Sequence, residues 1–143
     1  MNEVENLYLV KEIYRAFRNH NFAALRECLA EDVRWFAIGP PDLIPTAGTR
    51  YGPDQVAQYF EILSSVEAIR NFEPDEFIVS DNKVVALGQL ERFDTANGSL
   101  LRSPWVHIFI LDQRRVCDFR SFYDTAAAVA SLASVPFQIG RAS

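Results

Sequence analysis

Histidine and cysteine are scarce in this sequence, which holds two residues of each type. His20 and His107 stand far apart and in no HExxH-type pattern, so the usual spacing of metal ligands is missing. Cys28 and Cys117 form no CxxC pair, and we expect both to be reduced, half-buried side chains. Motifs of the GxGxxG, P-loop and GxSxG types are also lacking. The sequence therefore predicts neither a metal nor a nucleotide, flavin or other cofactor.

Dense positive charge and long apolar runs are lacking as well. The formal net charge is −5 at pH 7 and no basic stripe is visible, so a nucleic-acid partner is not expected. No segment has the length and apolarity of a membrane span, and the acidic start "MNEVENLYLV" is unlike a secretion signal. No repeat or low-complexity tract divides the 143 residues. We expect one domain over residues 1–143, located in the cytoplasm and not attached to a membrane.

Aromatic residues, in contrast, are plentiful: they make up 13% of the chain and include eleven Phe. Apolar side chains recur at helical spacing in residues 4–19, which predicts an amphipathic first helix. Asn21 can cap a short second helix over 22–30, and Asp124 can cap a closing helix over 124–133. A third helix opens at Gly52-Pro53-Asp54. Its apolar stripe consists of Val56, Tyr59, Phe60 and Leu63.

Strand patterns follow in the second half of the chain. A first strand is expected at 32–38, and four more at 67–80, 83–94, 100–111 and 116–123, separated by the turn sequences "SDNK", "TANGS" and "DQRR". Meandering strands after a helical start predict an α+β fold, with a curved antiparallel sheet wrapped around the N-terminal helices. The long connection 39–52 is rich in proline and glycine and is a candidate lid or rim of a site.

The stretch "QLERFDTANGS", residues 89–99, places charges at the end of an apolar strand. Because alternate strand residues share a face, Leu90, Arg92 and Asp94 are expected to point the same way. Two interpretations stay open for the charged pair. It is either a solvated strand end or the polar end of an internal pocket, where both charges would need partners.

Three blocks of sequence carry a resemblance to a known family: "FRNHNFAALRECLAEDVRW", "AGTRYGPDQVAQYF" and "VHIFILDQRRVCDFRSFYDTAAAV". In this order and spacing they resemble the nuclear transport factor two-like superfamily, which includes ketosteroid isomerases, SnoaL-like polyketide cyclases and limonene-epoxide hydrolases. The resemblance implies a cone-shaped, cystatin-like α+β barrel with a blind apolar pocket. It also implies a homodimer formed through the outer face of the sheet.

The catalytic positions of this superfamily are only partly filled here. The resemblance puts Ala37 at the general base of the ketosteroid isomerases and Val106 at their oxyanion-hole acid, and Tyr14 lies one position from their oxyanion tyrosine. The "ERFD" stretch resembles the "ERVD" type of the epoxide hydrolases. In that family the aspartate protonates the epoxide oxygen, and the arginine helps to hold the acid–base residues in place. This resemblance makes Asp94 and Arg92 the candidate catalytic pair. The three positions that hold water in that family fall on Trp35, Ala37 and Ser121.

The same alignment predicts which side chains face inward and which face outward. The expected pocket residues are Tyr14, Phe17, Trp35, Phe60, Val106, Ile108, Phe119, Ser121 and Tyr123. The expected outer face, and with it the dimer interface, consists of Trp105, His107, Phe109, Arg120 and Phe122. Monomeric proteins rarely leave so aromatic a surface uncovered.

Two functions from different classes fit these patterns. The first is a cofactor-independent acid–base enzyme of isomerase, cyclase, dehydratase or hydrolase type, acting on a small apolar oxygenated molecule in an enclosed pocket. In it Asp94 would shuttle the proton and Arg92 would steady its charge. The second is a non-catalytic ligand-binding or scaffold domain, favoured by Ala37, Val106 and Ser121 at catalytic positions of the family.

Overall fold

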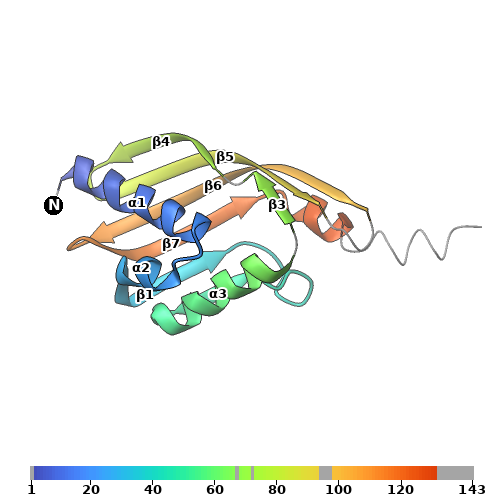
Figure 1. Cartoon of the computed structure of the whole chain (residues 1–143), viewed down its shortest axis with the longest axis horizontal. Helices are drawn as coiled ribbons and strands as arrows, with labels where there is room; N and C mark the ends of the chain where they lie inside the picture. The colour runs from blue at the N-terminus through green and yellow to red at the C-terminus, as the bar shows by residue number, and fades with distance from the viewer. Residues whose placement is uncertain (1, 67, 72, 94–97, 132–143) are drawn as a thin grey trace, which may run out of the picture.

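The computed structural model describes residues 2–66, 68–71, 73–93 and 98–131, and Figure 1 shows the arrangement of its helices and strands. The chain begins with two helices, and a third follows the first two strands. The elements in chain order are α1 (Glu3–Arg18), α2 (Phe22–Glu27), β1 (Leu29–Ala37), β2 (Gly48–Tyr51), α3 (Gly52–Val66), β3 (Ala68–Asn71), β4 (Pro74–Ser80), β5 (Lys83–Phe93), β6 (Leu100–Asp112) and β7 (Arg115–Tyr123). Residues 125–131 are helical as well.

The seven strands form one curved sheet in the order β2-β1-β7-β6-β5-β3, with β4 also paired to β5. Strands β1 and β7 are parallel, and the other pairs are antiparallel. The segment expected as one strand over 67–80 is divided, because β4 pairs with the first half of β5 and β3 pairs with its end. The predicted α+β fold with a curved sheet around N-terminal helices is confirmed.

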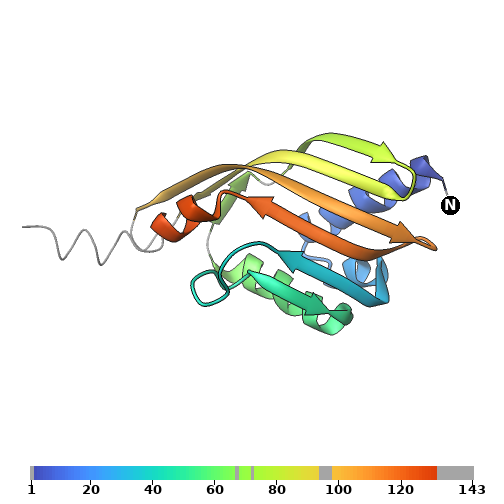
Figure 2. The same ribbon diagram turned by 180° about the vertical axis from the view of Figure 1, so that it is seen from behind.

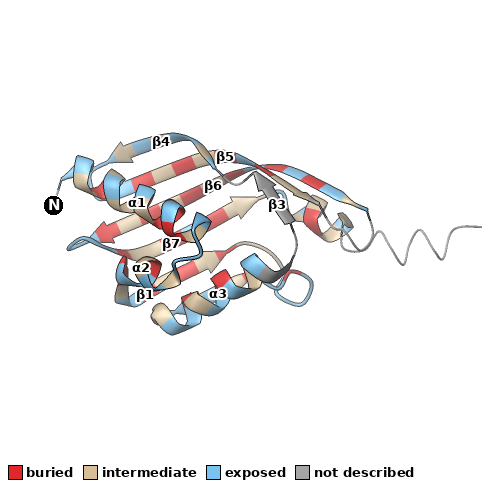
Figure 3. Ribbon diagram, viewed as in Figure 1, coloured by how far each residue is buried: buried red, intermediate tan, exposed pale blue. Residues whose placement is uncertain are grey.

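Helices α1, α2 and α3 lie on one face of the sheet, and in the reverse view they stand behind the strands (Figures 1 and 2). Helix α1 starts at a capping box, in which the Asn2 side chain accepts from the Glu5 N–H at 2.9 Å and Glu5 accepts from the Asn2 N–H at 3.1 Å. It buries Val10, Ile13 and Tyr14 against the sheet. The buried residues in Figure 3 alternate along the central strands, as expected for a sheet covered on one face.

Both side-chain caps predicted from the sequence are present. The Asn21 side chain accepts from the Ala24 N–H at 3.2 Å and starts α2. The Asp124 carboxylate accepts from the Ala127 N–H at 2.9 Å and starts the helix over 125–131. Among the described residues, no helix is long and apolar enough to cross a membrane.

The inward face of β6 differs from the prediction. Trp105, His107 and Phe109 are 1–4% exposed and belong to the core, whereas Val106 and Ile108 point to the opposite face and are only half buried. His107 and its two aromatic neighbours therefore cannot form an outer interface, and Val106 and Ile108 cannot line the interior.

A β-bulge explains this reversal. The β6–β7 hairpin turns at Gln113 and Arg114, both with positive φ, and Asp112 faces Arg115. Without a bulge, the ladder from this turn would pair Val106 with Ser121, which is the predicted arrangement. Instead the register shifts between Ile110 and Leu111, so that Cys117 is the extra residue of β7. His107 then pairs with Ser121, and a shift of one residue turns every β6 side chain to the other face.

The connection 39–52 packs against the core and is not a freely moving lid. Ile44 and Ala47 are 3% and 6% exposed, so the loop contributes to the core. The Arg50 guanidinium donates to the carbonyl oxygens of Thr46 at 2.7 Å and Pro45 at 3.1 Å. These contacts and strand β2 fix the loop against the edge of the sheet.

Candidate functional site

Two small cavities lie between the helices and the concave face of the sheet, and both are bordered by Tyr59, Leu63 and His107. The inner cavity has a volume of about 20 Å³ and a wholly apolar lining surface. The outer cavity has a volume of about 40 Å³ and includes polar side chains. One water molecule needs roughly 10–15 Å³ of such space and drug-sized ligands occupy several hundred Å³, so this interior would have to widen to admit an organic ligand.

The centre of this interior is a hydrogen bond between Tyr14 and His107. Helix α1 points the Tyr14 hydroxyl at Nδ1 of His107 on β6, at a distance of 2.7 Å. The two rings are nearly parallel, with an angle of 3° between their planes. Burial lowers the pKa of His107 from 6.5 to about 3, and burial raises the pKa of Tyr14. Both groups are therefore neutral near pH 7.

A second polar group, Tyr59, projects from α3. Its ring packs edge-on against Trp35 at 5.8 Å and against Phe60 at 5.1 Å, and the Arg50 guanidinium lies 5.5 Å from its centre. Burial raises the pKa of Tyr59, and the nearby Tyr123 raises it further. The Arg50 charge, the Ser121 hydroxyl and the Trp35 N–H act in the opposite direction, because each favours negative charge on the Tyr59 oxygen.

The outer cavity is lined by Arg92, one of the two candidate catalytic residues predicted from the sequence. Arg92 lines it together with Thr46 and Tyr123, so this arginine lies on the concave face of the sheet. Its neighbour Glu91 lies on the other face of β5 and pairs with Arg102 at 3.0 Å. Asp94 lies outside the described residues.

Most of the predicted pocket residues do surround the two cavities. Tyr14, Phe17, Trp35, Phe60 and Phe119 line the inner cavity, and Arg92, Ser121 and Tyr123 line the outer one. Ala37, at the position of the isomerase base, also lines the outer cavity.

Sequence reasoning missed His107, Tyr59, Trp105, Leu63 and Thr46 as lining residues. A signal was available for Tyr59, because a tyrosine in a buried helical stripe needs a partner for its hydroxyl. No comparable signal existed for His107, whose face depends on the bulge in the neighbouring strand.

The site offers hydrogen-bond donors within aromatic walls. Among the described lining residues there is no aspartate or glutamate. In the described part of the chain, no group of three or more His, Cys, Asp or Glu residues could hold a metal ion. The arrangement places a few hydrogen-bonding side chains, His107 among them, at the border of an apolar interior.

The sequence and the fold were compared with protein-family models and with solved structures. A family model, the SnoaL-like domain, matches residues 10–119. An NTF2-like protein from Burkholderia xenovorans LB400 superposes with a TM-score of 0.84 at 25% identity, over 92% of this chain and 98% of that one. An NTF2-like protein of unknown function from Burkholderia pseudomallei K96243 gives 0.81 at 27% identity, over 90% and 98%.

A protein assigned as a SnoaL-like polyketide cyclase from Jannaschia sp. CCS1 gives a TM-score of 0.74 at 17% identity, over 94% of this chain and 95% of that one. At this identity the similarity establishes the fold alone. No curated protein sequence matches the chain significantly.

Proposed function

Because the chain belongs to the SnoaL-like domain family, we propose that it is a cofactor-independent acid–base enzyme for a small apolar oxygenated molecule. The reaction types that fit are isomerisation, cyclisation, dehydration and hydration. Solved neighbours assigned as an isomerase and as a polyketide cyclase support a fold of this general type. The single observation that carries the proposal is the Tyr14–His107 hydrogen bond: both residues line the inner cavity, and His107 also lines the outer one.

The proposed roles follow from charge and position. Tyr14, whose pKa is raised by burial, shares a hydrogen bond with Nδ1 of His107 and is its donor when Nδ1 carries no proton. A neutral imidazole with a pKa of about 3 is a weak base, so we assign His107 a role in hydrogen bonding rather than as a general base near pH 7. Asp94 stays the candidate proton shuttle from the sequence, and Arg92 in the outer cavity is its candidate stabiliser.

Proton transfer can be tested without knowing the natural substrate. The protein is incubated in D2O with small cyclic and aromatic ketones, and with styrene oxide and cyclohexene oxide, and NMR follows α-proton exchange and product formation. We expect at least one compound to react faster than in buffer, and His107→Asn or Asp94→Asn to lower that rate about 100-fold.

The matched control for this assay is His20→Asn, since His20 is exposed and remote from the cavities. Circular dichroism verifies that each variant is folded. A wild-type protein that accelerates none of these reactions, or a rate that neither His107→Asn nor Asp94→Asn changes, would contradict an acid–base enzyme.

The small cavity volume and the buried Ala37 favour a second function, which is ligand binding without turnover. Native mass spectrometry of the purified protein separates the two functions. A single apolar compound carried through purification, and recovered unchanged after incubation, would support binding alone.

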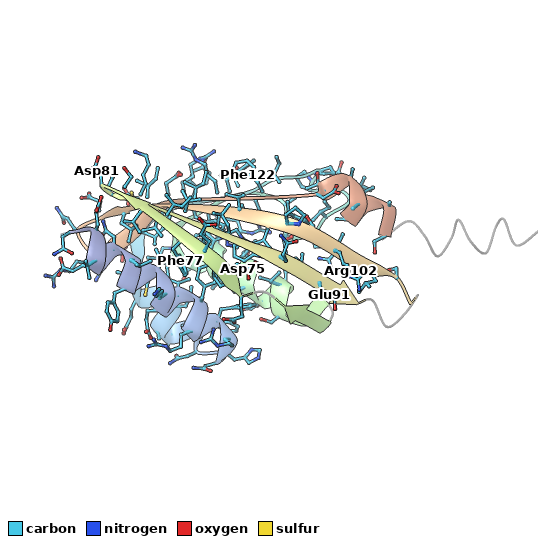
Figure 4. The ribbon with its side chains drawn as sticks, turned by 90° about the horizontal axis from the view of Figure 1, so that it is seen from above. Asp75, Phe77, Asp81, Glu91, Arg102 and Phe122 are labelled. Carbon is cyan, nitrogen blue, oxygen red and sulfur yellow. The ribbon has the colours of Figure 1, made fainter. Side chains whose placement is uncertain are left out.

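We further propose a homodimer through the outer face of the sheet, with its residues revised by the bulge. Phe122 points away from α1 in Figure 4, and Arg120, Val106 and Ile108 share its face. We expect light scattering to give a dimer at micromolar concentration, and Ile108→Glu to give a folded monomer, because an unpaired charge would be buried in the interface. Val4→Glu on α1, a position 68% exposed, is the control. A monomeric wild-type protein would overturn the dimer.

A further inference from the structure

An open hollow lies at the end of the molecule where α1 begins, and it shares no lining residue with the two interior cavities. The hollow has a volume of about 750 Å³, and its lining includes Glu3, Val4, Asn6, Asp81, Leu111 and Asp112. Three segments meet there: the first turns of α1, the turn between β4 and β5, and the end of β6. The Asp81 N–H donates to the Glu3 carboxylate at 2.8 Å and so joins the first two segments. Figure 4 shows Asp81 at the same end of the molecule as the start of α1.

Asn6 is the buried polar side chain of this hollow. It is 3% exposed and forms the base with Leu111, which is 2% exposed. The Asn6 Nδ2 donates to the carbonyl oxygen of Asp81 at 3.1 Å, which fixes the amide orientation, since the flipped amide would set two oxygen atoms against each other. The Asn6 Oδ1 is buried and has no hydrogen-bond partner among the described residues. Buried acceptors nearly always have a donor, so this oxygen calls for one from outside the chain.

The charges of the lining favour a cationic donor. Glu3, Asp81 and Asp112 bring three carboxylates to the rim, and no described lining residue is basic. None of the three forms an ion pair with a described residue, because Arg114 in the neighbouring turn pairs with Glu5 at 3.4 Å. The N-terminus of α1 contributes only about half an elementary positive charge, which does not offset three carboxylates.

We propose that this hollow binds an aliphatic polyamine. An ammonium group carries three donors and no acceptor, so it satisfies both the carboxylates and the Asn6 Oδ1, directly or through one bound water. The methylene chain between ammonium groups has apolar surface to lie on, at Val4 and Leu111. A metal ion fits less well, because no group of three or more His, Cys, Asp or Glu residues in the described ranges could hold one. A chain of separated charges can reach carboxylates on three different segments.

The test uses amines of different charge and a neutral analogue. Spermidine carries three ammonium groups and cadaverine carries two, and the diol with the carbon chain of cadaverine is uncharged. Each is titrated at physiological ionic strength into labelled protein, and proton–nitrogen NMR spectra follow the backbone amides of Asp81 and Gln113 and the side-chain amide of Asn6. We expect both amines to shift these signals and the diol to leave them in place. Spermidine should bind about 3- to 10-fold more tightly than cadaverine, since it makes one more charge contact.

A pair of double variants separates the hollow from the overall charge of the protein. Glu3→Gln combined with Asp112→Asn removes two of the three carboxylates and keeps an acceptor for the Asp81 N–H. We expect this variant to bind spermidine about 3- to 10-fold more weakly. Asp42→Asn combined with Glu61→Gln is the matched control, because it changes the net charge equally at two exposed positions outside the hollow. Its spermidine affinity should equal that of the wild-type protein.

Three outcomes would overturn the polyamine site. The first is that millimolar spermidine leaves the Asp81, Gln113 and Asn6 signals unshifted. The second is an equal loss of affinity in both double variants, which would mean that spermidine responds to net charge alone. The third is that MgCl2 at matched ionic strength shifts the same signals as far as spermidine does, which would mean that any counterion suffices. Because the hollow and the interior cavities share no lining residue, none of these results depends on whether the proposed enzyme activity is found.

Discussion

The stability of the wild-type protein is expected to fall more steeply in mild acid than the stability of a His107→Asn variant. His107 is 4% exposed and hydrogen-bonded to Tyr14, and burial lowers its pKa from 6.5 to about 3. Asparagine keeps an acceptor near the position of Nδ1 but does not titrate. The variant therefore removes the proton uptake of His107 and leaves the carboxylates of the protein unchanged.

The sign of the effect follows from proton binding in the two states. Between pH 6.5 and pH 3 the unfolded chain carries a proton on this imidazole that the folded chain lacks. Unfolding then takes up one proton and becomes more favourable as the pH falls, by about 1.4 kcal/mol per pH unit. The contribution is complete above pH 6.5 and is progressively lost below it. Over the whole window it amounts to roughly 5 kcal/mol at most, which is comparable to the total stability of many domains.

Urea unfolding at pH 8, 6.5, 5.5 and 5 measures this difference. At pH 8 we expect His107→Asn to be less stable than the wild-type protein by about 1–3 kcal/mol, because the imidazole ring is lost from a packed core. Toward pH 5 that gap should narrow by about 2 kcal/mol. His20→Asn, which replaces an exposed histidine, serves as the control. Parallel curves for His107→Asn would mean that the imidazole is protonated inside the folded protein.

The face on which His107 lies was the main feature that the sequence could not supply. Residues 105–111 are apolar or aromatic at nearly every position, so their pattern does not distinguish an inner face from an outer one. The bulge at Cys117 decides the face, and no residue type marks it. In contrast, α1 was predictable because its apolar stripe repeats at helical spacing, and Asn21 and Asp124 were recognised as caps by their residue type and position.

The aromatic residues that line the candidate site could be predicted from the sequence, but its polar contacts could not. Trp35, Phe60 and Phe119 line the inner cavity as expected, because the sheet and α3 bring large apolar faces together. The pairing of Tyr14 with His107 depends on the exact register of β6, and the packing of Tyr59 against Trp35 joins α3 to β1. Both arise from contacts between distant segments, and periodicity within one segment carries no information about them.

Gly88→Ala is expected to destabilise the protein by about 1–3 kcal/mol, and Gly88→Val by about 3 kcal/mol or more. Gly88 lies on the inner face of β5, directly opposite Trp105 on β6. A Cβ at this position would lie 2.5 Å from Cζ2 of Trp105 and 2.9 Å from the carbonyl oxygen of Glu73, closer than atoms can pack. The indole would have to move, and its ring centroid is 4.2 Å from that of His107. We therefore expect the substitution to disturb the candidate site as well as the fold, measured by urea unfolding and near-UV circular dichroism.

A double-mutant cycle with Trp105→Phe tests the proposed cause. The clash involves Cζ2 and Cε2, which belong to the six-membered ring of the indole, and phenylalanine removes part of that ring system. Trp105→Phe alone should destabilise the protein, since it leaves a gap beside Gly88. In the Trp105→Phe background, Gly88→Ala should cost at least 1 kcal/mol less than in the wild-type protein. The rescue should be incomplete, because the Glu73 carbonyl is backbone and stays in place. Additive effects of the two substitutions would contradict a clash with Trp105 as the cause of the destabilisation. They would mean that the backbone of β5 shifts at Gly88 while the indole keeps its position.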